Sequence, residues 1–219
     1  MGRYRARKAD SFKRKKPDRK PQALVLIVCE GEKTERQYLR ELCNDLWLSA
    51  ASVTITPSHL GSDPMSVVTY AIDRHKAEDE IYDRVYCVFD RDTHANYDQA
   101  LTRLNDSPFA KKGILHAITS VPCFEIWVLL HFAYSTASFV AGGGKSPCDK
   151  VVEAIHPHFG GYAKGPAGLY QHLKPMTNQA LTYAGQLTKH NHDSGSNNPA
   201  TKVHDLVRYL KSLADELGA

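Results

Sequence analysis

The chain has 219 residues, of which 42% are hydrophobic and 24% are charged, so it can bury one sizeable core. Its net charge is +4, yet residues 1–20 hold ten Lys or Arg against two Asp, which leaves 18 basic against 22 acidic residues, or −4, for the rest. No apolar stretch approaches the roughly 18 residues of a membrane-spanning helix, so we expect a soluble protein without a membrane partner.

The basic segment at residues 1–21 has neither apolar periodicity nor the apolar centre of a signal peptide. We expect it to be disordered, because too few apolar side chains are present to offset the entropy of ordering. Several roles stay open. It can be a solvated tail without a role, an arm that adds sequence-independent attraction to phosphates, or a contact for a ribosome or membrane.

An alternating strand and helix pattern follows this segment. Residues 23–29 form a continuous apolar run, typical of a strand buried on both faces of a parallel sheet. Further strands are predicted at residues 52–56, 84–90 and 113–120, and helices at residues 33–47, 62–79, 96–105 and 123–134. In the second of these helices Asp63 is the expected N-cap. This order predicts an α/β fold with right-handed crossovers and a mostly parallel sheet of about four strands.

Beyond residue 135 the strand signals fade and helical patterns dominate. Helices are predicted at residues 148–158, with Ser146 or Pro147 at the start, and at 176–190 and 200–218, with a polar loop at 191–199. The chain therefore divides into the basic tail 1–21, an α/β domain 22–135, and a helical extension 136–219 packed on that domain.

The five cysteines are odd in number, widely spaced and without a CxxC pair. This pattern indicates neither a disulfide framework nor a zinc site. We therefore expect reduced thiols in a cytoplasmic protein at all five positions, which are Cys29, Cys43, Cys87, Cys123 and Cys148.

Acidic residues follow two of the predicted strands. Glu30 ends the first, and Asp90 and Asp92 come at the end of the third. In an open α/β sheet, ligands bind at the carboxyl ends of the strands. If the strand conformation continued, Asp90 and Asp92 would point the same way and face Glu30. Close carboxylates repel one another, and a hard cation such as Mg²⁺ relieves that repulsion. The alternative is a solvated turn residue or helix cap at each strand end.

These residues also carry a family resemblance. Glu30-Gly31 together with Asp90-Arg91-Asp92 resembles the Toprim domain of topoisomerases, bacterial primases, recombination proteins and OLD-type nucleases, in which the acids bind Mg²⁺ for phosphodiester chemistry. A longer set of segments resembles the RloB-like family, which is associated with abortive infection and restriction-modification islands. These segments are VCEGEKTERQYLREL, VFDRD, PCFEIWVLLHF and NPATKVHDLVRYL. The resemblance covers nearly the whole chain after the tail and implies a Toprim-like fold.

The resemblance also implies roles for single residues. Glu30 would be a metal ligand or the general acid/base, Asp90 and Asp92 would hold the metal, and Glu125 would contribute to a second Mg²⁺ or Mn²⁺ ion. The alternative for Glu125 is a first-turn acid that complements the helix dipole. OLD-type enzymes use a basic residue on the scissile phosphate. Lys145 is a candidate here, and that role stays open.

Other features favour less specific interpretations. Glu32, Lys33 and Glu35 are expected to be exposed at a helix start, and His131 is expected in the core. The stretch AGGGKS is not a P-loop, because Phe139 stands where that motif requires glycine. The HNHD tetrapeptide at residues 190–193 is read as part of a polar loop rather than as a nuclease motif.

Together these inferences predict a cytoplasmic, metal-dependent nuclease that cleaves RNA, tRNA included, or DNA as the effector of an anti-phage abortive-infection system. The resemblance implies a separate ABC-type ATPase as partner and leaves a homo-oligomer open. The chief alternative is a metal-dependent nucleic-acid binder or regulator without cleavage. A further alternative is primer or nucleotide synthesis.

Overall fold

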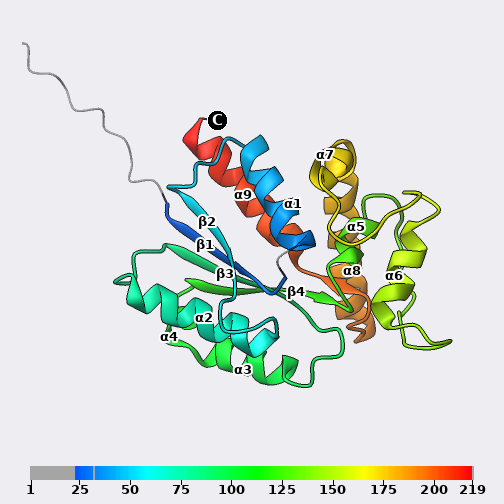
Figure 1. Cartoon of the computed structure of the whole chain (residues 1–219), viewed down its shortest axis with the longest axis horizontal. Helices are drawn as coiled ribbons and strands as arrows, with labels where there is room; N and C mark the ends of the chain where they lie inside the picture. The colour runs from blue at the N-terminus through cyan, green and yellow to red at the C-terminus, as the bar shows by residue number, and fades with distance from the viewer. Residues whose placement is uncertain (1–22, 32, 219) are drawn as a thin grey trace, which may run out of the picture.

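The computed structural model describes residues 23–31 and 33–218, so the expectations for the basic tail and for Glu32 lie outside the described residues. At its centre is a five-stranded sheet in the order β2-β1-β3-β4-β5 (Figure 1). The strands are β1 (Val25–Cys29), β2 (Val53–Pro57), β3 (Arg84–Asp90), β4 (Leu115–Val121) and β5 (Ala200–Thr201). The first four are parallel and β5 is antiparallel to β4, which confirms the prediction of a mostly parallel α/β sheet.

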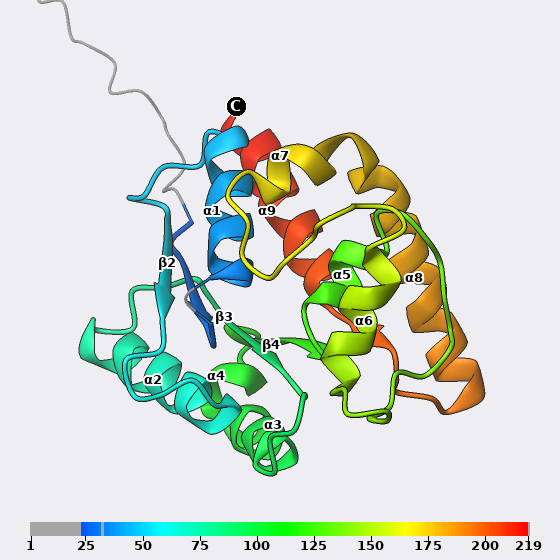
Figure 2. The same ribbon diagram turned by 45° about the vertical axis from the view of Figure 1, so that its right-hand side comes forward.

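Helices cover both faces of this sheet. They are α1 (Thr34–Asp45), α2 (Pro64–Ala77), α3 (Tyr97–Asp106), α4 (Pro108–Lys111), α5 (Glu125–Leu129), α6 (Pro147–Ile155), α7 (Leu169–Leu173), the 3₁₀ helix Lys174–Met176, α8 (Thr177–Ser194) and α9 (Val203–Leu217). Helices α2, α3 and α4 lie on one face, and α1 and α9 on the other (Figure 1). Helices α5, α6 and α8 gather beyond the end of β4, and α7 lies beside α1 (Figure 2). Within the described residues, no helix is both long and apolar enough to cross a bilayer.

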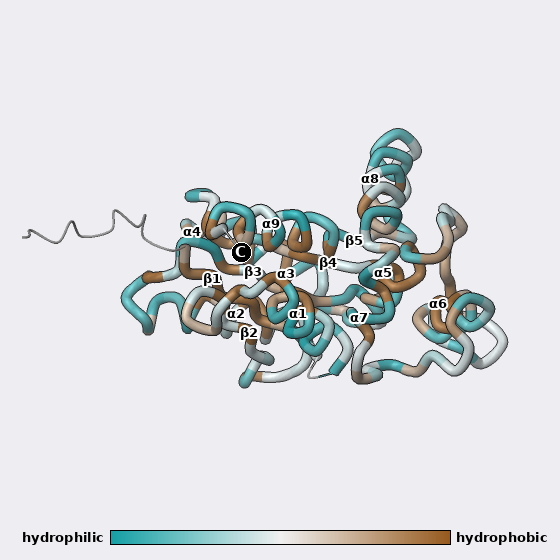
Figure 3. The backbone as a smooth tube through the Cα atoms, turned by 90° about the horizontal axis from the view of Figure 1, so that it is seen from above, coloured by the Kyte–Doolittle hydropathy of each residue, from teal (hydrophilic) through white to brown (hydrophobic). Residues whose placement is uncertain are grey.

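The continuous apolar run of β1 has a direct structural cause. Val25, Ile27 and Cys29 face the core under α1 and α9, whereas Leu26 and Val28 face the core under α2 and α3. Successive side chains of a strand point to opposite faces, so a strand covered on both sides needs apolar residues at every position. Brown colour along β1 and β3 in Figure 3 marks these two strands as the hydrophobic centre of the molecule.

Local signals placed several helix starts correctly. The Asp63 carboxylate accepts hydrogen bonds from the backbone N–H groups of Met65 and Ser66, so it caps α2 as predicted. Ser146 caps α6 in a reciprocal capping box with Asp149. His131 is also in the core as predicted. Its Nδ1 lies 2.8 Å from the Trp127 carbonyl oxygen, and burial lowers its pKa to about 4.

Several elements differ from the sequence prediction, among them the four-residue helix α4, which was not predicted. The short strand β5 was missed, because two residues carry no recognisable period. Helix α5 has five residues instead of the predicted twelve-residue segment, since the chain leaves the helical path after Leu130. Helix α8 continues to Ser194, so the HNHD residues lie in its last turns and not in a loop. Their polarity suits an exposed helix as well as a loop, and Gly195 with φ +70° ends the helix.

The expectation of five reduced cysteines is wrong for two of them. Cys123 and Cys148 form a disulfide, while Cys29, Cys43 and Cys87 are free and buried. The two bonded residues are 25 positions apart, a spacing with no sequence signature. The fold brings them together because the end of β4 lies beside the start of α6.

An irregular segment at residues 160–168 follows α6 and packs against α1. The Glu41 carboxylate on α1 accepts hydrogen bonds from the backbone N–H groups of Gly168, at 2.8 Å, and Tyr170, at 2.9 Å. Gly165 has φ +76°, and a Cβ atom there would lie 2.9 Å from Lys33 Cβ. A glycine is therefore required at this contact, and the segment is held firmly against the start of α1.

We expect Glu41→Ala to lower the free energy of unfolding by about 1–2 kcal/mol, because two backbone donors lose a charged acceptor. Chemical denaturation monitored by circular dichroism measures the change. The matched control is Glu153→Ala, which removes only an exposed ion pair with Lys145 and should change stability by less than about 0.5 kcal/mol. Equal effects of the two substitutions would contradict the anchoring role of Glu41.

Candidate functional site

The ends of β1 and β3 bring Glu30 and Asp90 together, because these strands are neighbours in the sheet. Glu30 Oε2 accepts a hydrogen bond from the backbone N–H of Asp90 at 2.9 Å, and Glu30 Oε1 lies 2.7 Å from Nε2 of His94. Burial raises the pKa of Glu30, and the Asp90 N–H and His94 act in the opposite direction. The Glu30 carboxylate is therefore fixed across the junction of the two strands.

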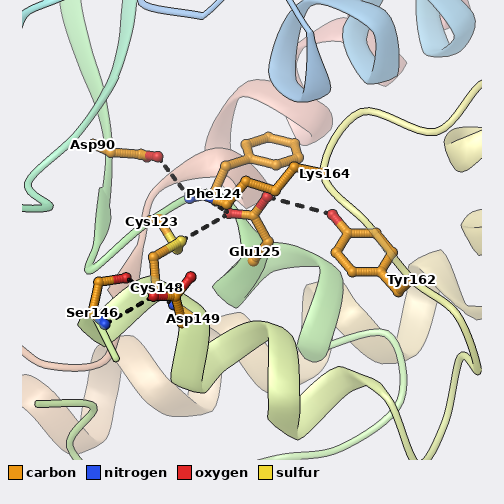
Figure 4. Close-up of a disulfide and its surroundings, with 9 residues drawn as sticks. All are labelled: Asp90, Cys123, Phe124, Glu125, Ser146, Cys148, Asp149, Tyr162 and Lys164. Carbon is orange, nitrogen blue, oxygen red and sulfur yellow. Dashed lines mark hydrogen bonds and ion pairs between the residues drawn. A yellow bond between two sulfur atoms is a disulfide. The ribbon is translucent and has the colours of Figure 1, made fainter. Parts of the chain in front are cut away.

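Asp90 joins this junction to the start of α5. Its Oδ2 accepts a hydrogen bond from the backbone N–H of Phe124 at 3.0 Å (Figure 4). Burial raises the pKa of Asp90 well above its ordinary value, and the negative charges of Glu35, Glu125 and Glu30 raise it further. The carboxyl group thus lies where several like charges meet.

Asp92 reaches the site through a turn and not through a continued strand. Strand β3 ends at Asp90, and Asp92 has φ +32°, so the expectation that the strand conformation runs on to Asp92 is wrong. Its backbone N–H donates to the Pro122 carbonyl at 2.8 Å, which fixes the turn against the end of β4. Its side chain is exposed, and its charge contributes to the raised pKa of both Glu30 and Glu125.

Glu125 is the first residue of α5 and is only 2% exposed. Its Oε1 lies 3.5 Å from the hydroxyl of Tyr162, and its Oε2 lies 3.8 Å from Nζ of Lys164 and 3.3 Å from Sγ of Cys148 (Figure 4). Burial raises the pKa of Glu125, while the Lys164 charge lowers it. A first-turn acid in this position is thus enclosed by side chains instead of facing solvent.

Glu35 is the acid that the sequence prediction placed wrongly. It was expected to be exposed, but it is half-buried in the first turn of α1, and a Cβ atom added at Gly31 would lie 2.8 Å from its Oε2. Burial, followed by the charges of Glu125 and Glu30, raises its pKa to about 7. The available signal was Gly31 itself, because a residue without a side chain after a strand leaves room for a neighbouring carboxylate.

Tyr162 and Lys164 were also missed, since residues 159–175 carry no periodic pattern. Lys145, the basic residue considered from sequence, forms an ion pair with Glu153 of α6. The lysine in contact with Glu125 is Lys164.

The electrostatic balance of the site is negative. Five acidic side chains gather here, and the basic side chains that contact them among the described residues are the Lys164 ammonium group and the His94 imidazole. The five are Glu30, Glu35, Asp90, Asp92 and Glu125. Carboxylate oxygens are the ligands that hard divalent cations prefer, so this donor set fits Mg²⁺ or Mn²⁺.

Comparison with known proteins identifies the family. A model of the RloB-like protein family matches residues 25–210, which span the sheet and run from β1 into α9. No curated protein and no solved structure matches the chain. The resemblance of the sequence segments to the RloB-like family is thereby confirmed.

The raised pKa of Glu35 predicts a pH dependence of stability. Its value is about 7 in the folded chain against an ordinary 4.5, so the folded chain keeps this proton to higher pH. The contribution of Glu35 to stability is present below about pH 4.5 and is lost as pH rises through about 7. We expect Glu35→Gln to remove this loss and to raise the free energy of unfolding near pH 8 by on the order of 2 kcal/mol.

Denaturant unfolding across this pH range, without divalent metal, measures the difference between the two chains. Glu216→Gln, which changes an exposed acid on α9, is the control and should follow the wild-type curve. A Glu35→Gln curve parallel to the wild type at every pH would show that Glu35 is not held in a repulsive environment.

Proposed function

We propose that this chain, which belongs to the RloB-like family, is a Toprim-fold nuclease that uses Mg²⁺ or Mn²⁺ to hydrolyse phosphodiester bonds in RNA, tRNA included, or in DNA. Its proposed role is the effector of a cytoplasmic anti-phage abortive-infection system. The observation that carries the proposal is the convergence of carboxylates from the ends of β1 and β3, the first turn of α1 and the start of α5.

The architecture supports the Toprim assignment. The parallel strands β1 and β3 are adjacent, a glutamate follows β1, and β3 ends on the first of two closely spaced aspartates. That is the arrangement which the resemblance implies for Toprim acids. Ligands bind at the carboxyl ends of strands in such sheets, and this edge is where the acids gather.

The raised pKa values of these acids support a metal-binding site rather than a cluster with a purely structural role. Structural acids are usually paired, whereas here burial and mutual repulsion raise the pKa of several acids together. The residues that would hold metal are Glu30, Asp90, Asp92 and Glu125. When bound, two such ions supply activation of a water molecule and stabilisation of the leaving oxygen.

The protein's own side chains have separate tasks in this proposal. Lys164, whose side chain is 50% exposed, contacts Glu125 from one side and is free to bind a phosphate oxygen of the substrate from the other. Glu41 fixes the segment that carries Lys164, and Tyr162 adds a hydroxyl donor toward Glu125. His94 keeps the Glu30 carboxylate oriented by contact with Oε1.

We include a separate ABC-type ATPase in the proposal as the partner that senses infection, because the family resemblance implies one. The AGGGKS stretch is consistent with this, since Phe139 stands where a P-loop requires glycine.

Cleavage of nucleic acid by the purified full chain tests the function directly. Total cellular RNA and plasmid DNA are incubated with Mg²⁺, Mn²⁺ or EDTA, and new ends are mapped by sequencing. We expect metal-dependent cuts that Asp90→Asn and Glu125→Gln slow at least about a hundredfold, because each removes a charged oxygen from the site. The matched control is Asp98→Asn on the exposed face of α3, which should cleave at the wild-type rate.

Equal cutting by the wild type and Asp90→Asn would overturn the catalytic assignment. Metal-dependent binding that Asp90→Asn abolishes, without cuts in any lane, would favour the alternative of a non-cleaving binder. Consumption of nucleoside triphosphates would favour primer or nucleotide synthesis.

Lys164 has a distinct expected signature. Lys164→Ala should slow cleavage by about a hundredfold through loss of a phosphate contact, yet bind Mn²⁺ at least as tightly as the wild type, because a positive charge beside Glu125 is gone. Lys145→Ala is the control and should leave both properties within about twofold. Titration calorimetry gives the Mn²⁺ affinity. Weaker Mn²⁺ binding by Lys164→Ala would contradict this role.

A further inference from the structure

The disulfide lies directly against the Glu125 carboxylate. Cys123 immediately precedes Phe124, whose backbone N–H binds Asp90, and then comes Glu125. Cys148 is in the first turn of α6. The two cysteines are 1% and 2% exposed, and Figure 4 shows the bond beside the Glu125 carboxylate.

The oxidation state of this pair changes what faces Glu125. Sγ of Cys148 lies 3.3 Å from Oε2 of Glu125. A disulfide sulfur has no proton, so in the bonded form Oε2 receives no hydrogen bond from Cys148. A thiol at the same place would donate to Oε2 and occupy one of its acceptor positions.

The bond also holds the short helix that positions two of the acids. Helix α5 has five residues and no side-chain cap at its start, and so short a helix has little stability of its own. The disulfide links Cys123, which lies two residues before the start of α5, to Cys148 in the first turn of α6, across a sequence separation of 25 residues. Opening the bond removes the covalent restraint on this segment and leaves the Phe124 amide with its hydrogen bond to Asp90 and Glu125 with its contacts to Tyr162 and Lys164.

The remaining cysteines are poor sites for oxidation. Burial raises the thiol pKa of Cys29 and Cys87 in the strands, and that of Cys43 on α1 to about 12. Thiols of this kind stay protonated and unreactive. By contrast, Cys148 follows residues 141–145, which are exposed, so local opening at the start of α6 gives reagents a route to the pair.

We propose that Cys123 and Cys148 form a reversible thiol–disulfide modification site, and that its disulfide form makes the adjacent acidic site bind divalent metal more tightly than the dithiol form does. Glutathione disulfide is the oxidant. One cysteine thiolate attacks it and releases one glutathione. The second cysteine then attacks the mixed disulfide and releases the other, so two cysteines are oxidised, two glutathiones are reduced, and the two cysteine protons pass to the glutathione thiolates. The effect on metal rests on the proposed function, whereas the thiol chemistry does not.

Thiol labelling of the full chain tests the modification. The protein is equilibrated in buffers of increasing glutathione disulfide to glutathione ratio, quenched with acid, alkylated in denaturant and analysed by peptide mass spectrometry. We expect Cys123 and Cys148 to lose their label together and to regain it in excess dithiothreitol, while Cys29, Cys43 and Cys87 stay labelled throughout. Persistent labelling of the pair under oxidising conditions, or a bond that dithiothreitol does not open in the folded chain, would overturn the proposal.

Titration with Mn²⁺ alone tests the consequence for the site. We expect the disulfide form of the wild type to bind about tenfold more tightly than its dithiol form. The Cys123→Ser/Cys148→Ser variant should bind equally in both buffers, and Cys43→Ser, the control, should keep the tenfold difference. The wild-type comparison needs no substitution, so a variant that fails to fold does not affect it.

Equal Mn²⁺ affinity of the disulfide and dithiol forms of the wild type would overturn the proposal that the disulfide regulates metal binding. No Mn²⁺ binding in either form would overturn both the proposed regulation of metal binding and the proposed metal-dependent function. The thiol labelling would still decide whether the Cys123–Cys148 disulfide forms reversibly.

Discussion

Repulsion among carboxylates at one edge of a parallel sheet is the interaction around which this molecule is organised. Strands β1 and β3 run in the same direction, so Glu30 and Asp90 necessarily emerge side by side. Glu35 and Glu125 add further negative charge at partly or fully buried positions. Desolvation and like charges act in the same direction here and raise the pKa of each group. A fold that keeps such a cluster must hold it by other contacts.

Those contacts come mainly from the backbone and from segments outside the sheet. Amide groups of Asp90 and Phe124 donate to the carboxylates of Glu30 and Asp90. Lys164 brings a positive charge from a segment that is itself anchored on α1, and α6 is bonded to the entrance of α5. The helical extension therefore does more than cover the sheet, because it supplies Lys164 and Cys148, whose side chains lie next to Glu125.

The sheet and the helical extension thus contribute differently to the proposed metal site and to its proposed regulation by the disulfide. The sheet supplies the carboxylates that are proposed to bind metal, and residues of the helical extension contact Glu125. In the proposal, a change at the Cys123–Cys148 bond alters metal affinity without any change in the strands. Local stability differs among parts of a structure, and a five-residue helix such as α5 responds more readily than a central strand.

The sequence by itself determined the layers of the fold and the position of two acids. Continuous apolar runs identified β1 and β3, so Glu30 and Asp90 could be recognised as strand ends, and Asp63 and Ser146 identified helix starts. These signals act within one strand or one turn, and the residues that report them are neighbours in the chain.

Only the tertiary structure decided the surroundings of the acids. The burial of Glu35, the contact of Lys164 with Glu125, the Cys123–Cys148 bond and the pairing of β5 with β4 join segments whose separation leaves no periodic trace. The turn at Asp92 depended likewise on the carbonyl of Pro122, the residue that follows β4. Such contacts follow from how whole elements pack, and local patterns carry no record of that packing.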